Sequence, residues 1–98
     1  MFRNTETAGG FRFPGFHPDV ARALLGRDVA GVAVDTLSLD HGGSKDFGFH
    51  TTWLGAGRWG LECVANLDQV PAAGATLVVG GPKVKGASGG PSRVLALI

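Results

Sequence analysis

The 98-residue sequence contains no tyrosine, a single cysteine and no long apolar segment. No apolar run approaches the ~18 residues of a membrane-spanning helix, so the sequence predicts no such helix. The lone cysteine, Cys63, excludes an internal disulfide, and we expect a reducing compartment, with the cytoplasm as the default. The first ten residues, MFRNTETAGG, lack the apolar core of a signal peptide, which supports that expectation.

An excess of one charge is also missing. Nine Lys and Arg residues are nearly matched by eight Asp and Glu residues, and the net charge is +1. Because the basic residues are scattered and balanced, the sequence argues against a nucleic-acid-binding surface.

Glycine, in contrast, is abundant: the sequence has 17 glycines, more than twice the ~7% that is usual. The glycines have no regular period and alternate with apolar runs, which favours a compact fold with many tight turns.

The order of apolar and polar residues predicts an α/β fold with about four strands and two or three short helices. Helices are expected at 17–26, from 49 to 55 or 57, and as a single turn at 66–71. Strands are expected at 29–35, 58–65, 74–84 with a break at 80–82, and 93–98. No repeat or boundary is visible, so we expect one domain over residues 1–98. These strands carry more apolar surface than the helices can cover, which predicts a homo-oligomer or a partner chain over exposed sheet.

His50 and Glu62 stand out because the surrounding segment, FHTTWLGAGRWGLECVANL at 49–67, is mostly apolar and glycine-punctuated. Carboxylates are seldom buried unless they are paired or bind a metal. A helix followed by a strand lets the chain double back, so residues twelve positions apart are able to face one pocket. The alternative is that His50 caps a helix and Glu62 lies at the surface. Two ligands also leave a zinc site incomplete, since catalytic zinc takes three protein ligands and a water.

Other candidates have simpler explanations. The segment HGGSKDF, 41–47, holds histidine and carboxylate, but its glycines favour a solvated turn. The glycine-rich VGGPKVKGASGG, 79–90, lacks the G-x-x-x-x-G-K-[ST] pattern and no helix is expected after it, which argues against nucleotide binding. Cys63 follows an acidic residue, which favours a packed thiol over a nucleophile. His17 is expected to cap a helix, and the aromatic residues around it, in FRFPGFHP, to make core or lid contacts.

Several short motifs follow one another along residues 14–98. They are a proline-glycine opening before a helix (Pro14, Gly15), a strand ending in D-T-x-S-x-D (Asp35, Thr36, Ser38, Asp40), a histidine with a glutamate twelve residues on (His50, Glu62), N-L-D-x-x-P (Asn66, Leu67, Asp68, Pro71) and a glycine-rich segment with proline and arginine (Gly89, Gly90, Pro91, Arg93). In this order they resemble the C-terminal half of the cyclase family, which includes bacterial kynurenine formamidases (arylformamidases) and isatin hydrolase.

The resemblance implies a mixed β-sheet with flanking helices in a swivelling β/β/α fold, and a divalent-metal hydrolase that opens amide bonds in formamides or cyclic amides. It implies that His50 ligates the metal or acts as acid and base beside it, and that Glu62 is a carboxylate ligand. The cofactor would be Zn²⁺ or Mn²⁺. The substrate would be a small amide, such as N-formylkynurenine in tryptophan catabolism, and no nucleic-acid or membrane partner is implied.

The sequence departs from the family in its metal motif. The family's principal motif, H-x-G-T-H-x-D, belongs to an N-terminal half that these residues do not match, and HGGSKDF carries Lys45 where the second histidine would stand. Three interpretations stay open: a fragment of a hydrolase, one chain of a split enzyme, or a degenerate protein that kept the fold as a non-catalytic assembly or binding module. A further hypothesis is a homodimer that joins two His50/Glu62 pairs in one four-ligand site.

Overall fold

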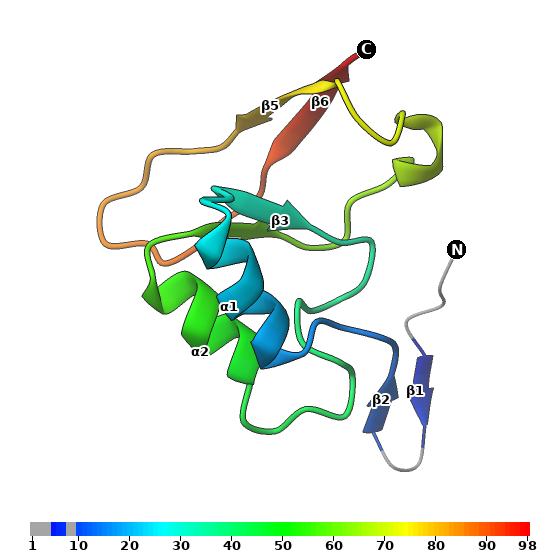
Figure 1. Ribbon diagram of the computed structural model, residues 1–98, viewed down its shortest axis with the longest axis vertical. Coiled ribbons are helices and arrows are strands. Elements are labelled where there is room, and N and C mark those ends of the chain that lie inside the picture. Colours follow the sequence, from blue (N-terminus) through cyan, green and yellow to red (C-terminus); the bar gives the residue numbers. More distant parts are fainter. Residues whose placement is uncertain (1–4, 8–9) are drawn as a thin grey trace. The chain divides into compact units, whose positions relative to one another are not determined.

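A computed structural model of the chain describes residues 5–7 and 10–98 (Figure 1). Residues 1–4 and 8–9, which belong to the stretch where the sequence predicts no signal peptide, lie outside the described residues. The chain forms two compact units, Met1–Ala65 and Asn66–Ile98. The single domain expected over residues 1–98 stays a prediction. In the described part of the chain, no helix has both the length and the apolar character needed to cross a membrane.

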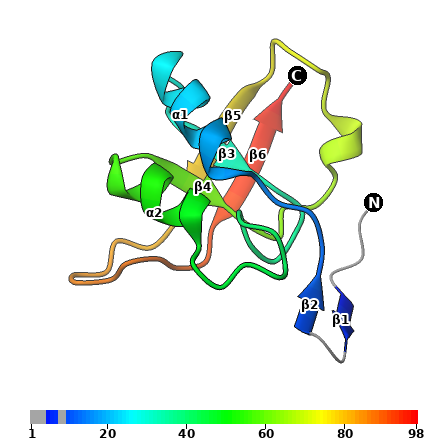
Figure 2. The ribbon, with the colours of Figure 1, turned by 60° about the horizontal axis from the view of Figure 1, so that its bottom comes forward.

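Among its described residues, the first unit contains two helices and two pairs of short strands. Its elements are β1 (Thr5–Thr7), β2 (Gly10–Arg12), α1 (Pro18–Gly26), β3 (Gly31–Ala33), α2 (Gly48–Gly55) and β4 (Trp59–Leu61). Strands β1 and β2 pair antiparallel, whereas β3 and β4 pair parallel with Val32 opposite Gly60. Figures 1 and 2 show α1 and α2 side by side next to the β3–β4 pair.

Helix α1 begins and ends where its sequence indicates. His17 is the N-cap, and its ring Nδ1 accepts a hydrogen bond from the Asp19 backbone N–H at 3.1 Å. Pro18 suits the first turn because its ring presets φ and it has no N–H to satisfy, and the acidic Asp19 complements the helix dipole. The capping role expected for His17 is therefore confirmed.

The core of this unit lies between the two helices and the parallel strands. Its fully buried members are Ala21, Leu39, Phe49 and Trp53. The rings of Phe49 and Trp53 stack with centroids 5.7 Å apart, and Phe16 packs on Phe49 at 4.9 Å. Trp53 also donates its indole N–H to the backbone oxygen of Trp59 at 2.8 Å, which ties α2 to β4.

The second unit is a single turn of helix followed by a hairpin. The turn spans Leu67–Gln69, and strands β5 (Thr76–Gly80) and β6 (Arg93–Leu97) pair antiparallel. Val78 stands opposite Leu95, and Leu77 stands opposite Ala96. Because paired residues share a face and neighbours alternate, the hairpin is apolar on both faces.

The α/β character and the two helices are confirmed, but the strand pattern differs from the prediction. The β1–β2 hairpin was not expected, and the strand expected at 29–35 is reduced to the three residues of β3. The strand expected at 58–65 ends at Leu61, because Cys63 has a left-handed φ of 57° that interrupts the extended backbone. The packed thiol expected at Cys63 is wrong, since this residue is exposed.

Candidate functional site

His50 lies in the first turn of α2, and both nitrogens of its ring are engaged. Nδ1 lies 2.7 Å from Asp40 Oδ2, and Nε2 lies 3.1 Å from Glu62 Oε1. The side chain is about one quarter exposed, so one edge of the ring is accessible. The two side chains that the sequence singled out, His50 and Glu62, are thus in contact. Their roles as metal ligands or catalytic groups stay predictions.

Asp40 is almost fully buried and accepts three hydrogen bonds from α2. Its Oδ1 accepts from the Phe49 N–H at 2.7 Å, and its Oδ2 accepts from the His50 N–H at 3.0 Å and faces His50 Nδ1. Helix α2 has no cap from its own N-cap residue, Phe47, which has a left-handed φ of 50°. Asp40 therefore satisfies N–H groups at the start of α2 that would otherwise lack partners.

These hydrogen bonds lower the pKa of Asp40. Burial by itself would raise that pKa, but hydrogen bonds from the backbone and ring of His50 and from the backbone of Phe49 outweigh it and hold the pKa below the ordinary 3.8. The carboxylate is consequently ionised near neutral pH. An ionised carboxylate can only accept hydrogen bonds, so the proton between Asp40 and His50 belongs to Nδ1.

Glu62 follows β4 directly and is held against the segment after β3. On either side of it, Leu61 O accepts from Val34 N–H at 2.9 Å and Cys63 N–H donates to Thr36 O at 2.9 Å. Its Oε1 also accepts from the Leu39 N–H at 3.3 Å. The Glu62 side chain is 37% exposed and the Asp40 side chain 3% exposed, so Glu62 lies on the solvent side of His50 and Asp40 on its buried side.

The segment that carries Asp40 is fixed from the other side by residues 13–16. Phe16 N–H donates to Leu39 O at 2.8 Å, and Gly42 N–H donates to Phe13 O at 2.9 Å. Gly15 abuts this segment so closely that a Cβ atom there would lie 2.1 Å from the His41 backbone nitrogen. The proline-glycine opening noted in the sequence thus has a steric purpose: it permits close approach of two backbones.

The arrangement around His50 leaves two acceptor atoms facing each other. Because Nδ1 carries a proton toward Asp40, a neutral ring presents the lone pair of Nε2 to the carboxylate oxygen of Glu62 at 3.1 Å. Such a contact is favourable only when a positive charge is shared there, either a proton on Nε2 or a cation bound by both groups. The site is therefore chemically suited to a proton or a metal ion.

The donor set fits part of a divalent metal site. An imidazole nitrogen and a carboxylate oxygen suit Zn²⁺ and Mn²⁺ alike. Asp40 contacts the opposite nitrogen of the ring, as partners of metal-binding histidines commonly do. Among the described residues, no group of three or more His, Cys, Asp or Glu side chains is arranged to hold a metal ion. His50 and Glu62 would thus supply two ligands, and further ligands would have to come from outside the described residues.

The 41–47 segment makes mostly local interactions, although the ring of Phe47 packs edge-on against that of His50. In the 41–47 segment, Ser44 donates to Asp46 Oδ1 at 3.1 Å and accepts from the Phe47 N–H at 3.2 Å, which is a turn stabilised by its own side chains. His41 in the same segment is exposed, in agreement with the solvated turn expected there.

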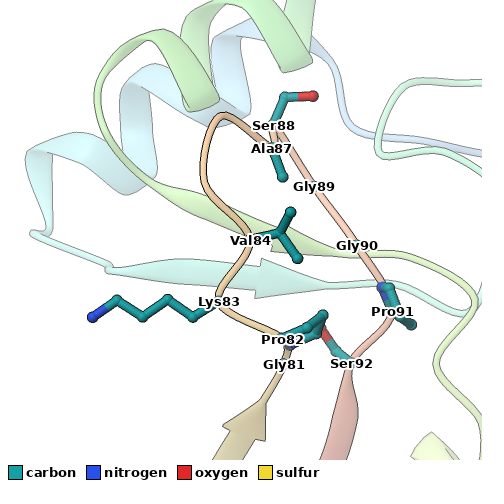
Figure 3. Close-up of a pocket in the computed structure, with 10 residues that line it drawn as sticks. All are labelled: Gly81, Pro82, Lys83, Val84, Ala87, Ser88, Gly89, Gly90, Pro91 and Ser92. Carbon is teal, nitrogen blue, oxygen red and sulfur yellow. The ribbon is translucent and has the colours of Figure 1, made fainter.

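The glycine-rich segment forms the connection between β5 and β6. Residues 81–84 and 87–92 line a hollow of about 330 Å³, and each of them is exposed (Figure 3). Figure 3 shows the Lys83 side chain pointing away from the loop, while Val84 points into it. The segment leads into β6 rather than into a helix, so it has no helix N-terminus with which to bind a phosphate.

Asp40 is the residue that the sequence interpretation left out of the site. It was visible only as the last letter of D-T-x-S-x-D, a polar cluster at the end of a strand. Its distance of ten residues from His50 has no helical or strand period, so no spacing rule connects them. The available signal was the position of an acidic residue shortly before a helix whose N-cap, Phe47, cannot cap it.

Comparisons with known proteins place the chain close to isatin hydrolases. It is 32% identical over 101 aligned residues to isatin hydrolase from Roseibium aggregatum, an alignment that covers 99% of this chain and 38% of that protein. Its structure matches the crystal structure of an isatin hydrolase bound to the product analogue thioisatinate, with a TM-score of 0.89 and 31% identity. This match covers 94% of the chain and 37% of that structure. No protein-family model matches the chain.

The comparisons support the isatin hydrolase side of the resemblance and confirm the cyclase-like α/β fold. The kynurenine formamidase side stays a prediction. The chain spans less than two fifths of the length of the relatives that it matches. This coverage agrees with the expectation that only one part of a cyclase-type hydrolase is represented in these 98 residues.

Proposed function

We propose that this chain carries part of the active site of a metal-dependent amide hydrolase of the cyclase family, with His50 and Glu62 as metal-binding residues. The observation that supports this most directly is the 3.1 Å contact between His50 Nε2 and Glu62 Oε1, two groups that need a positive charge between them. The similarity to isatin hydrolase over nearly the whole chain supports the reaction class. A cytoplasmic location, expected from the single cysteine, is part of the same proposal.

The reaction would be the opening of a cyclic amide such as isatin, with N-formylkynurenine as the alternative substrate. Water adds to the amide carbonyl carbon and the C–N bond breaks. One proton of the water goes to the nitrogen and the other is lost to solvent, and the carbonyl carbon becomes a carboxylate, which stays on the product of a cyclic amide and leaves as formate from a formamide. A bound Zn²⁺ or Mn²⁺ would lower the pKa of water and polarise the carbonyl. Of the chain's own groups, Glu62 would hold its carboxylate toward the ion. His50 would either do the same through Nε2 or pass a proton to the leaving nitrogen from that atom.

The remaining ligands would be supplied by residues that correspond to the uncovered three fifths of the relatives. This requirement separates the interpretations left open by the sequence. A fragment or a split-enzyme subunit gains these ligands when the complementary polypeptide is present. A degenerate module lacks them and binds partners without catalysis.

Equilibrium dialysis against Zn²⁺ or Mn²⁺ tests the proposed site. The purified chain is freed of metal with a chelator, and bound metal per chain is then measured by elemental analysis. Because two protein ligands completed by water hold an ion weakly, the dialysis is carried to saturating metal. Uptake should then approach one ion per chain in the wild type and in the control His41→Gln, which changes an exposed histidine, and should be lost in His50→Gln. Equal uptake by all three proteins, or none by the wild type, contradicts the proposal. Loss of isatin absorbance in the metal-loaded wild type, but not in His50→Gln, would extend it to catalysis.

We also propose that a second polypeptide covers the β5–β6 hairpin. A two-stranded hairpin that is apolar on both faces is marginal in water unless something packs on it. The exposed apolar side chains are Leu77, Val78, Val79, Leu95, Leu97 and Ile98, each more than two fifths accessible. The low coverage of the relatives favours a partner that carries the rest of the hydrolase fold, rather than a second copy of this chain.

A further inference from the structure

Asp40 makes one contact that helix capping does not require. Two of its hydrogen bonds, from the backbone N–H groups of Phe49 and His50, would serve any helix start. The third, at 2.7 Å, goes to Nδ1 of the His50 ring. It comes from a carboxylate whose side chain is 3% exposed, so water does not compete for it. The His50 ring is therefore held by a buried anion on the side away from Glu62.

We propose that Asp40 is a positioning residue for the metal site: it keeps the proton of the His50 ring on Nδ1 and thereby presents the lone pair of Nε2 toward Glu62. The inference rests on the proposed function for the identity of the cation, but its structural part concerns the ring alone. Without Asp40, the neutral ring gains by placing its proton on Nε2, where the Glu62 carboxylate accepts it. In that tautomer Nε2 has no lone pair for a cation.

The geometry also explains why the orientation of the ring is fixed. The same carboxylate oxygen, Oδ2, contacts the backbone nitrogen of His50 at 3.0 Å and its ring nitrogen at 2.7 Å. The backbone contact sets where the residue lies, and the ring contact sets which way the imidazole turns. The Phe47 ring meets the His50 ring edge-on, with centroids 5.8 Å apart, and limits its movement. Carboxylate partners of this kind raise metal affinity because the ligand is oriented before the ion arrives.

The substitution that isolates this role is Asp40→Asn. An asparagine has one accepting oxygen and one donating NH₂ group, so it retains one backbone hydrogen bond of α2 but cannot accept from both Oδ positions. Asparagine keeps an accepting oxygen that is able to face Nδ1, so the ring tautomer is tested in Asp40→Ala. Alanine leaves no acceptor beside Nδ1, and the proton is then free to move to Nε2, toward Glu62. The matched control is Asp46→Asn, which changes an exposed carboxylate bound only to a nearby serine within the same loop.

The first readout is the tautomer of His50 by ¹⁵N NMR in the chelator-treated full chain. His17→Gln and His41→Gln backgrounds assign the three ring signals. At a pH where the ring carries one proton, we expect that proton on Nδ1 in the wild type and in Asp46→Asn, and on Nε2 in Asp40→Ala. A wild-type ring with Nδ1 unprotonated overturns the inference, and so does a proton that stays on Nδ1 in Asp40→Ala. If Asp40→Ala does not fold, the wild-type spectrum alone tests where the proton lies.

The second readout is the dissociation constant for Zn²⁺ by calorimetry. We expect Asp40→Asn to bind Zn²⁺ about 10–100-fold more weakly than the wild type, and Asp46→Asn to bind it equally well. Equal affinity in Asp40→Asn and wild type overturns the positioning role. If the wild type binds no Zn²⁺, the proposed function fails while the NMR result still tests the placement of the ring proton. The two failures are therefore distinguishable.

Discussion

Gly15 lies against the backbone of Asp40 so closely that a Cβ atom at Gly15 would come within 2.2 Å of the Asp40 carbonyl carbon. No side chain fits there without moving one of the two segments. Gly15 and Asp40 are far apart in the sequence. A hydrogen bond between their neighbours, from Phe16 N–H to Leu39 O at 2.8 Å, holds the two segments together. The position of the Asp40 carboxylate beneath α2 therefore depends on a residue far from it in the sequence.

Replacing Gly15 by alanine should displace Asp40 and weaken the fold. We expect Gly15→Ala to lower the free energy of unfolding by about 1–3 kcal/mol, because the added methyl group overlaps backbone atoms that cannot rotate away. The control is Gly26→Ala at the end of α1, where a Cβ atom would have no neighbour within 4 Å. Urea unfolding measures both variants. Equal stability of the two would contradict this account of Gly15.

Removing the charge of Glu62 should abolish metal binding at the site. In Glu62→Gln the side chain keeps its size and one accepting oxygen for the Leu39 N–H, but it loses the anionic oxygen that a divalent cation requires. We expect bound metal per chain to fall to the background of metal-free buffer, while Asp68→Asn, which changes an exposed carboxylate in the second unit, retains it. Unchanged metal content in Glu62→Gln would sink the assignment of this residue.

Asp40 should make stability depend on pH in the acidic range. Its pKa in the folded protein is lowered, because the hydrogen bonds from His50 and Phe49 outweigh the effect of burial. The unfolded chain therefore takes up a proton at a higher pH than the folded one does. The stabilisation is complete above the ordinary pKa of 3.8 and is lost as pH falls through the lower folded value.

In the presence of a chelator, the difference in unfolding free energy between the wild type and Asp40→Asn should accordingly shrink as the pH falls below the ordinary carboxyl pKa of 3.8. Urea unfolding across this range measures it. The corresponding difference for Asp46→Asn should stay near zero throughout, since that side chain is exposed. A constant difference for Asp40→Asn would show that its hydrogen bonds do not depend on ionisation.

The two aromatic residues of α2 should dominate the stability of the first unit. Phe49 is fully buried between Phe16 and Trp53, so Phe49→Ala removes a ring and leaves a cavity. We expect a loss of about 3–5 kcal/mol. Leu54→Ala, on the same helix but 46% exposed, should cost less than about 1 kcal/mol. Thermal unfolding of both variants gives the comparison, and similar losses would mean that the core lies elsewhere.

The helices were predictable because their signals are local. The histidine cap, Pro18 at the first position and Gly26 at the last identify α1 from adjacent residues alone. Strands β5 and β6 are likewise indicated by two apolar runs with a glycine-rich connection, although the sequence does not show that they pair with each other. The β1–β2 hairpin was missed because its strands have only three residues each and lack an apolar alternation.

The candidate site was predictable only in part. The residue types and the family resemblance predict that His50 and Glu62 lie together, but the backbone around Glu62 differs from the prediction. The sequence predicts a strand that continues through Cys63, whereas the left-handed φ of Cys63 ends the extended backbone directly after Glu62. The role of Asp40 depends on the close packing of Gly15 against it, a tertiary contact that no period in the sequence encodes.

Charges on the β5–β6 hairpin should block association without harming the chain. Leu77 and Leu95 belong to opposite faces of the hairpin, and both are more than two fifths exposed. Because neither is buried by the chain's own residues, we expect Leu77→Lys and Leu95→Lys each to change the free energy of unfolding by no more than about 0.5 kcal/mol. A polypeptide that packs on one face would have to bury the new ammonium group, which is costly without a partner charge.

Sedimentation of the chain alone, and after mixing with a polypeptide that matches the uncovered part of isatin hydrolase, tests this. We expect the wild type to form a one-to-one complex with that polypeptide. The variant with its lysine on the face that the polypeptide covers should form no complex. Ser88→Lys, in the exposed connection between β5 and β6, is the control for the added charge itself. A wild-type homodimer that both leucine variants dissociate would instead identify a second copy as the partner. That outcome would contradict the proposal of a complementary chain. The hypothesis to test next would then be a homodimer in which two His50 and Glu62 pairs form one four-ligand site.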